Sequence, residues 1–171
     1  MNATHNISEK SAKRIFNISC IALIVTAMTF AIRAGILGEL GVQYGLSGEQ
    51  LGWITTMAFW GFPLAMIFGG ALYNAIGAKL IVWLAFIGHA LGLVLTIIAD
   101  SFWGLMISSF LIGFANGLVE AGCNPIIAQL YPNNKTAMLN RFHVWFPGGI
   151  VIGSLVSAGM TKLGLGWEAQ V

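Results

Sequence analysis

Residues 102–130 read FWGLMISSFLIGFANGLVEAGCNPIIAQL and contain one charged side chain, Glu120. The hydrocarbon core of a bilayer is about 30 Å thick, and a helix crosses it with about 20 consecutive apolar residues. The apolar residues of this stretch are continuous, whereas a membrane β-strand has about 10 residues and alternates polar with apolar side chains. Because a helix satisfies its own backbone hydrogen bonds in lipid, the stretch predicts a transmembrane helix.

The composition of the whole 171-residue chain agrees with this prediction. Hydrophobic residues make up 57% of the chain and charged residues 8%, whereas soluble chains carry roughly 25% charged residues. A water-soluble globule and a disordered chain are therefore excluded. The net charge is +2 and the basic residues form no stripe, so we expect no nucleic-acid partner. Cys20 and Cys123 lie in apolar runs without metal-ligand spacing, so we expect no metal and no cofactor.

Four further apolar runs are long enough to cross a membrane. Together with 102–130, the predicted helices cover about residues 15–37, 51–73, 79–99 and 142–163. The predicted fold class is an all-α membrane protein, a bundle of five transmembrane helices over residues 15–171 that follows a tail at 1–14. The odd number of helices and the lack of a polar carboxy-terminal tail predict an amino-terminal fragment that ends before a sixth helix.

Lysine and arginine gather on one side of this predicted bundle. Three lie in the tail, and three more lie in the links after the second and fourth helices: Lys10, Lys13, Arg14, Lys79, Lys135 and Arg141. Positive charge marks the cytoplasmic side, so we expect a cytoplasmic amino terminus and insertion in the cell's inner membrane. Trp53, Trp103 and Trp167 fall near the opposite ends of the helices, where an aromatic belt is expected.

The stretch at 102–130 also carries a polar strip. Asn116, Glu120 and Asn124 are spaced by four and share one helix face, and Pro125 follows, which predicts a kink. A carboxylate near mid-membrane costs at least about 2.5 kcal/mol and normally faces a partner or a wet cavity. We interpret Glu120 as lining a substrate or proton pathway. The alternative is a structural carboxyl, and the two asparagines could equally form interhelical hydrogen bonds.

Two more polar side chains fall inside predicted helices. Arg33 could bind substrate, pair with Glu120 or extend to the membrane surface, where its charge would stay in water. At 1.5 Å per residue, Arg33 and Glu120 lie at depths that differ by about 12 Å, which argues against a direct pair. His89 could carry protons, but a lone histidine among small residues favours an interhelical hydrogen bond.

One segment resembles a loop motif of the major facilitator superfamily. Residues 70–79, GALYNAIGAK, are similar to the motif GxLaDrxGrk that joins helices two and three in that superfamily. The motif residues are kept at Gly70, Leu72, Gly77 and Lys79, and the chain departs from the motif at Asn74, Ala75 and Ala78. Residues 45–52, GLSGEQLG, also resemble the entry to helix two. The resemblance implies the first five helices of a twelve-helix transporter.

Other segments resemble the fucose permease-like branch of sugar:proton symporters. Residues 117–125, GLVEAGCNP, match the fourth helix of that branch, in which a glutamate precedes small residues and Asn-Pro, and residues 135–153 are similar as well. The resemblance implies that Glu120 takes part in substrate binding and proton coupling, with Asn124 beside it. The branch has an aspartate near the position of Arg33.

Three functions are compatible with these observations. The first is proton-coupled uptake of a sugar or similar small hydrophilic solute, with protons, the lipid bilayer and the remaining carboxy-terminal half of the transporter as partners. The second is a facilitator for a non-sugar solute, such as an anion bound by Arg33. The third is a helical membrane scaffold or accessory subunit. An enzyme is not expected, because the chain has no phosphate-binding loop, no HExxH and no catalytic Ser/His/Asp set.

Overall fold

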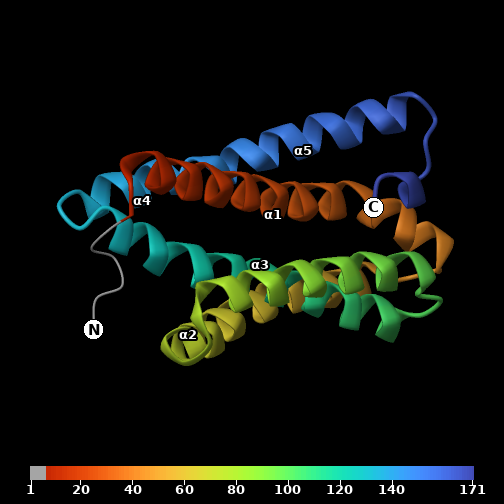
Figure 1. The fold of residues 1–171 in the computed structure, drawn as a ribbon. Coiled ribbons are helices and arrows are strands. Elements are labelled where there is room, and N and C mark those ends of the chain that lie inside the picture. Colours follow the sequence, from red (N-terminus) through yellow and green to blue (C-terminus); the bar gives the residue numbers. More distant parts are fainter. Residues whose placement is uncertain (1–6) are drawn as a thin grey trace.

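A computed structural model describes residues 7–171, so the first six residues of the predicted tail lie outside the described part. The described residues form helices and no strand (Figure 1). The elements are α1 (Glu9–Gln43), α2 (Gly48–Ile98), α3 (Phe102–Leu130), α4 (Lys135–His143), α5 (Trp145–Lys162) and the short 3-10 helix η1 (Trp167–Ala169). The all-α architecture of the prediction is therefore confirmed.

The predicted second and third helices form one element, α2, with a reversal inside it. Gly77 has φ 76° and ψ 159°. This conformation lies outside the helical region and is one that glycine adopts more readily than other residues. A straight helix of 51 residues would be about 76 Å long, whereas α2 folds back so that its two halves run side by side (Figure 1). The described residues contain four helices long and apolar enough to cross a membrane, so five separate helices are not confirmed. The reason is that the predicted link at 74–78 shrinks to a single non-helical residue.

The bounds of the other helices also differ from the predicted ones. α1 begins at Glu9, where the Ser8 side chain accepts a hydrogen bond from the Ser11 amide at 3.2 Å, so residues 9–14 of the predicted tail are helical. Only Val144 separates α4 from α5. The helical region before Phe142 is polar, so a pattern of apolar runs does not predict it. α3 has the predicted bounds.

The helices pack as two pairs, α1 with α5 and α2 with α3 (Figure 1). Small residues spaced by four along α3 and α5 make both contacts close. A methyl group at Gly113 of α3 would lie 2.7 Å from Ala58 Cα of α2, and one at Gly149 of α5 would lie 2.7 Å from Ala27 Cβ of α1. The backbones therefore approach so closely that no side chain fits between them.

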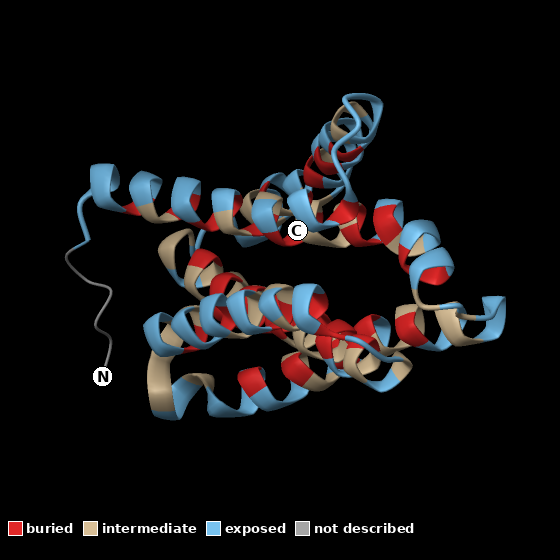
Figure 2. Cartoon of the chain, turned by 90° about the vertical axis from the view of Figure 1, so that its right-hand side faces the viewer, coloured by how far each residue is buried: buried red, intermediate tan, exposed pale blue. Residues whose placement is uncertain are grey.

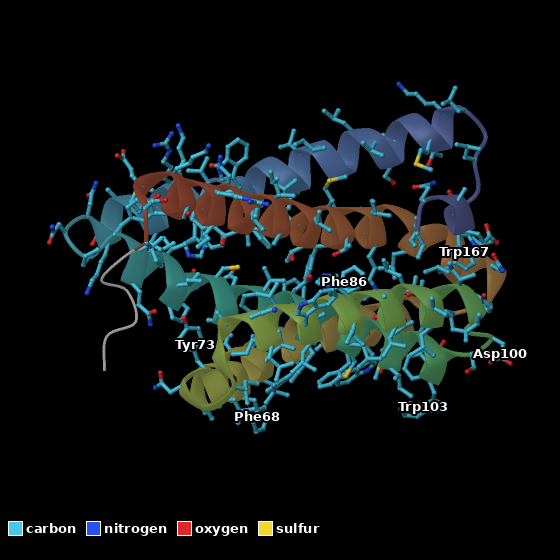
Figure 3. All side chains as sticks on the ribbon, viewed as in Figure 1. Phe68, Tyr73, Phe86, Asp100, Trp103 and Trp167 are labelled. Carbon is cyan, nitrogen blue, oxygen red and sulfur yellow. The ribbon has the colours of Figure 1, made fainter. Side chains whose placement is uncertain are left out.

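Two apolar clusters join the pairs at opposite ends of the bundle. One cluster, around Phe16 and Phe142, lies at the end that carries the reversal in α2, which we call the Lys79 end. The other, around Leu40 and Trp167, lies at the end with Asp100 and Trp103, which we call the Asp100 end (Figure 3). Buried residues line the inner sides of the helices and exposed residues the outer sides (Figure 2).

The exposed surface is apolar, as expected for helices in lipid. Trp53 is 50% exposed and Trp103 68% exposed, in keeping with an aromatic belt. Trp167 lies at the Asp100 end, as predicted (Figure 3), but it is buried there and is not part of an exposed belt. Its indole Nε1 donates a hydrogen bond to Gln43 Oε1 of α1 at 2.6 Å.

Candidate functional site

The polar strip of α3 faces the interior of the bundle. Asn116 is completely buried, and Glu120 and Asn124 are partly buried. Glu120 lies one turn before Asn124 on α3, and His143 at the end of α4 is near its carboxyl. Asn124 Oδ1 is buried and has no hydrogen-bond partner among the described residues. Glu120 is therefore partly shielded inside the bundle and lies near other polar groups.

His89 and Asn116 form the interhelical contact that the sequence favoured. His89 Nε2 lies 2.6 Å from Asn116 Oδ1, and His89 Nδ1 lies 3.0 Å from the carbonyl oxygen of Ala85, one turn earlier in α2. The helices come close here because Gly88 has no side chain: a methyl group there would lie 3.1 Å from Ala115 Cβ. Glycine packing thus brings the imidazole of α2 against the amide of α3.

Arg33 of α1 binds neutral groups near the Asp100 end. Its guanidinium donates hydrogen bonds to Thr96 Oγ1 of α2 at 2.9 Å and to the carbonyl of Leu105 and the hydroxyls of Ser108 and Ser109 on α3. Arg33 is 8% exposed, so it does not extend to the membrane surface, and its partners do not include Glu120. The alternatives that Arg33 extends to the membrane surface or pairs with Glu120 are therefore wrong. Arg33 lies at the same depth in the bundle as the hydroxyls of Thr96, Ser108 and Ser109.

Two hollows lie near these groups. Arg33, Thr55, Phe30 and Phe59 line a cavity of about 190 Å³ between α1, α2 and α3. A larger hollow of about 500 Å³ lies between α1, the second half of α2 and α3, where Phe86 projects (Figure 3). Its lining is almost wholly apolar, and a hydrophilic solute needs polar groups to orient it. We therefore place the candidate site at the polar strip and not in the larger hollow.

The sequence singled out all five side chains but not the groups that hold them. Thr96, which binds Arg33, was not singled out, and neither was His143 near Glu120. We expect Ser109 to bond its own helix backbone, but its hydroxyl accepts from Arg33 instead. We expect Ser108 to bond its own helix backbone, and it does so at 2.9 Å while also accepting from Arg33. A comparison of residue depths on neighbouring helices could have found these partners, since Arg33 and the hydroxyls lie near the same end of the bundle.

Comparison with known proteins gives the family. The sequence profile of the Major Facilitator Superfamily matches residues 19–169. Similar curated proteins include Myo-inositol transporter 1 of Candida albicans, 23% identical over 96% of this chain and 31% of that protein. A protein named Probable nitrate/nitrite antiporter of Thermus thermophilus is 28% identical over 69% of this chain and 28% of its own length. The D-xylose transporter of Levilactobacillus brevis is 24% identical over 74% of this chain and 28% of its own length.

These matches cover most of this chain but a small part of each relative. The chain spans less than a third of the length of the curated relatives it matches. The apolar helices agree with an integral membrane protein. Since the profile match extends from α1 to η1, the chain belongs to the Major Facilitator Superfamily, a family of membrane transporters and not of enzymes.

Proposed function

We propose that the protein containing this chain carries a small hydrophilic, sugar-like solute across the inner membrane and couples its movement to protons at Glu120. The observation that supports this most is the position of Glu120, a partly buried carboxyl on α3 between Asn116 and Asn124 and near His143. Two of the similar proteins are named as transporters of myo-inositol and D-xylose.

An acidic side chain in this position has an energetic cost that a substrate or proton path would explain. A charged group near mid-membrane costs at least about 2.5 kcal/mol and normally marks a substrate or proton path. Proton binding at the Glu120 carboxylate removes its charge, so the energy of moving this part of the bundle depends on whether a proton is bound. Amide groups such as that of Asn124 can donate to and accept from sugar hydroxyls.

The proposed carrier needs more helices than this chain contains. Transporters of this architecture bind solute near the midplane between two halves and expose it to each side in turn. In this proposal, α1 and α3 contribute one wall of the site, and the remaining carboxy-terminal half contributes the other. The amino terminus is on the cytoplasmic side.

The test uses the full-length protein in proteoliposomes with radiolabelled pentoses and inositol. We expect Glu120→Gln to abolish proton-driven accumulation but to keep exchange of labelled for unlabelled solute, because exchange needs no net proton movement. Glu39→Gln is the matched control, since Glu39 is an exposed glutamate of α1 and should leave both activities unchanged. Proton-driven accumulation that persists in Glu120→Gln would contradict the role of Glu120.

A second function, facilitation of an anionic solute, has support from Arg33. Its buried guanidinium lines the 190 Å³ cavity and has only neutral partners among the described residues. One similar protein is named as a nitrate/nitrite antiporter. Nitrate uptake by the same proteoliposomes, lost in Arg33→Gln and unaffected by Glu120→Gln, would favour this function over sugar transport.

A further inference from the structure

The contact between His89 and Asn116 has a hydrogen-bonding pattern that depends on the protonation of the imidazole. A carbonyl oxygen can only accept, so His89 Nδ1 carries a hydrogen and donates it to Ala85 O at 3.0 Å. The second ring nitrogen, Nε2, lies 2.6 Å from Asn116 Oδ1, which is also an acceptor. His89 satisfies both contacts at once only as an imidazolium with two N–H groups.

The amide of Asn116 has a free group that makes a second arrangement possible. Its Nδ2 is buried without a hydrogen-bond partner among the described residues, and the residue has no exposed surface. The oxygen and the NH₂ of an amide have nearly the same shape, so a half-turn of the amide exchanges them within the same volume. After that half-turn, Nδ2 donates to the lone pair of a neutral His89 at Nε2.

We propose that His89 and Asn116 form a second proton-binding site, in which rotation of the Asn116 amide adapts the site to each protonation state of His89. Binding forms one N–H bond at Nε2 and breaks one O–H bond of a hydronium ion, which leaves as water; release is the reverse. The Nδ1–H bond to Ala85 is unchanged in both states. The part of this site in transport rests on the proposed function, but proton binding itself does not.

The charges around this site tie it to Glu120. On α3, Glu120 follows Asn116 by one turn, and side chains spaced by four have Cβ atoms about 5–6 Å apart. A Glu120 carboxylate attracts an imidazolium at His89, whereas Arg33 on α1 repels it. Among the remaining titratable groups on these elements, Glu39 of α1 and Glu49 of α2 lie toward the Asp100 end. The others lie nearer the Lys79 end: Glu9, Lys10, Lys13, Arg14 and Cys20 on α1, Tyr73 and Lys79 on α2, and Cys123 on α3. A proton at His89 therefore favours an unprotonated Glu120, and the two sites do not act independently.

The test is ¹⁵N NMR of histidine-labelled full-length protein in detergent, with His89→Gln to assign the signals of His89. Between about pH 5 and 8, the range in which imidazoles ordinarily titrate, we expect Nε2 to change from protonated to unprotonated while Nδ1 stays protonated. Asn116→Asp offers only acceptors and should hold His89 as an imidazolium throughout this range. Asn116→Leu offers neither donor nor acceptor and should hold it neutral.

The outcomes separate this proposal from the one above. An Nε2 signal of His89 that stays in one state over the whole pH range would overturn the second site, even if Glu120→Gln abolishes proton-driven accumulation. Asn116 variants that titrate like the wild type would overturn the role of the amide. A titrating His89 in a protein whose uptake is indifferent to protons would keep the second site and refute proton coupling. The wild-type titration needs no Asn116 variant, so it decides the question even if those variants fail to fold.

Discussion

Replacement of Gly113 by alanine tests whether the direct backbone contact between α2 and α3 stabilises the bundle. A methyl group at Gly113 would lie 2.7 Å from both Cα and the carbonyl carbon of Ala58 and nearer still to its carbonyl oxygen. Ordinary contact begins at 3.4 Å, so the methyl carbon would be about 0.7 Å too close to these two carbons and would overlap the oxygen more severely. The obstructing atoms belong to the backbone of α2 and cannot turn aside, so the two helices must separate.

This separation has a measurable free energy. Insertion of one extra carbon into a well-packed interior costs about 1–3 kcal/mol. Alanine also favours the helix over glycine by about 0.5–1 kcal/mol, so a control must account for that gain. Gly52→Ala is the matched control, because Gly52 lies in α2 with no atom within 4 Å of the added carbon. We expect Gly113→Ala to be less stable than Gly52→Ala by about 1–3 kcal/mol.

The assay is equilibrium unfolding of the full-length protein by SDS in mixed micelles, followed by tryptophan fluorescence. Gly113→Ala and Gly52→Ala are compared with the wild type under one lipid and detergent composition. Equal stability of the two variants would refute the reasoning, since it would mean that the helices separate at no cost. A loss of stability in both variants would also refute the reasoning, because the methyl group at the control position Gly52 has free space.

Two further predictions use the same unfolding assay. Gly77→Ala should destabilise the protein by about 1–3 kcal/mol, because φ 76° with ψ 159° is a backbone conformation that only glycine adopts readily. The added carbon itself meets no atom within 4 Å. Unchanged stability would show that α2 can reverse direction without glycine at this position. Arg33→Gln should lower the free energy of unfolding by about 1.5–3 kcal/mol, because the charged hydrogen bonds from Arg33 to Thr96, Ser108 and Ser109 are lost. Arg33→Lys should retain part of this stability. Equal stability of the wild type and both variants would rule out a stabilising link from Arg33 between α1 and α3.

Local features of the chain were predictable because they depend on neighbours in sequence. Ser47 and Gln50 form the capping box that their spacing predicts, with hydrogen bonds of 3.2 and 2.9 Å. The spacing of Gly113 and Gly117 predicts close contact with another helix, and the structure places α2 there. The start of α1 at Glu9 was not predictable from apolar runs, because its first turns are polar and the Ser8 cap determines where the helix begins.

The amino-acid sequence alone determined that this protein is a bundle of membrane helices and that Glu120 lies on a polar face of one of them. Both follow from residue type and periodicity, which act over one or two helical turns. Only the tertiary structure decided that Arg33 binds hydroxyls and not Glu120, that His89 meets Asn116, and that α2 reverses at one glycine. These contacts join residues far apart in the chain, and their partners depend on the relative depth and rotation of whole helices, which no local pattern specifies.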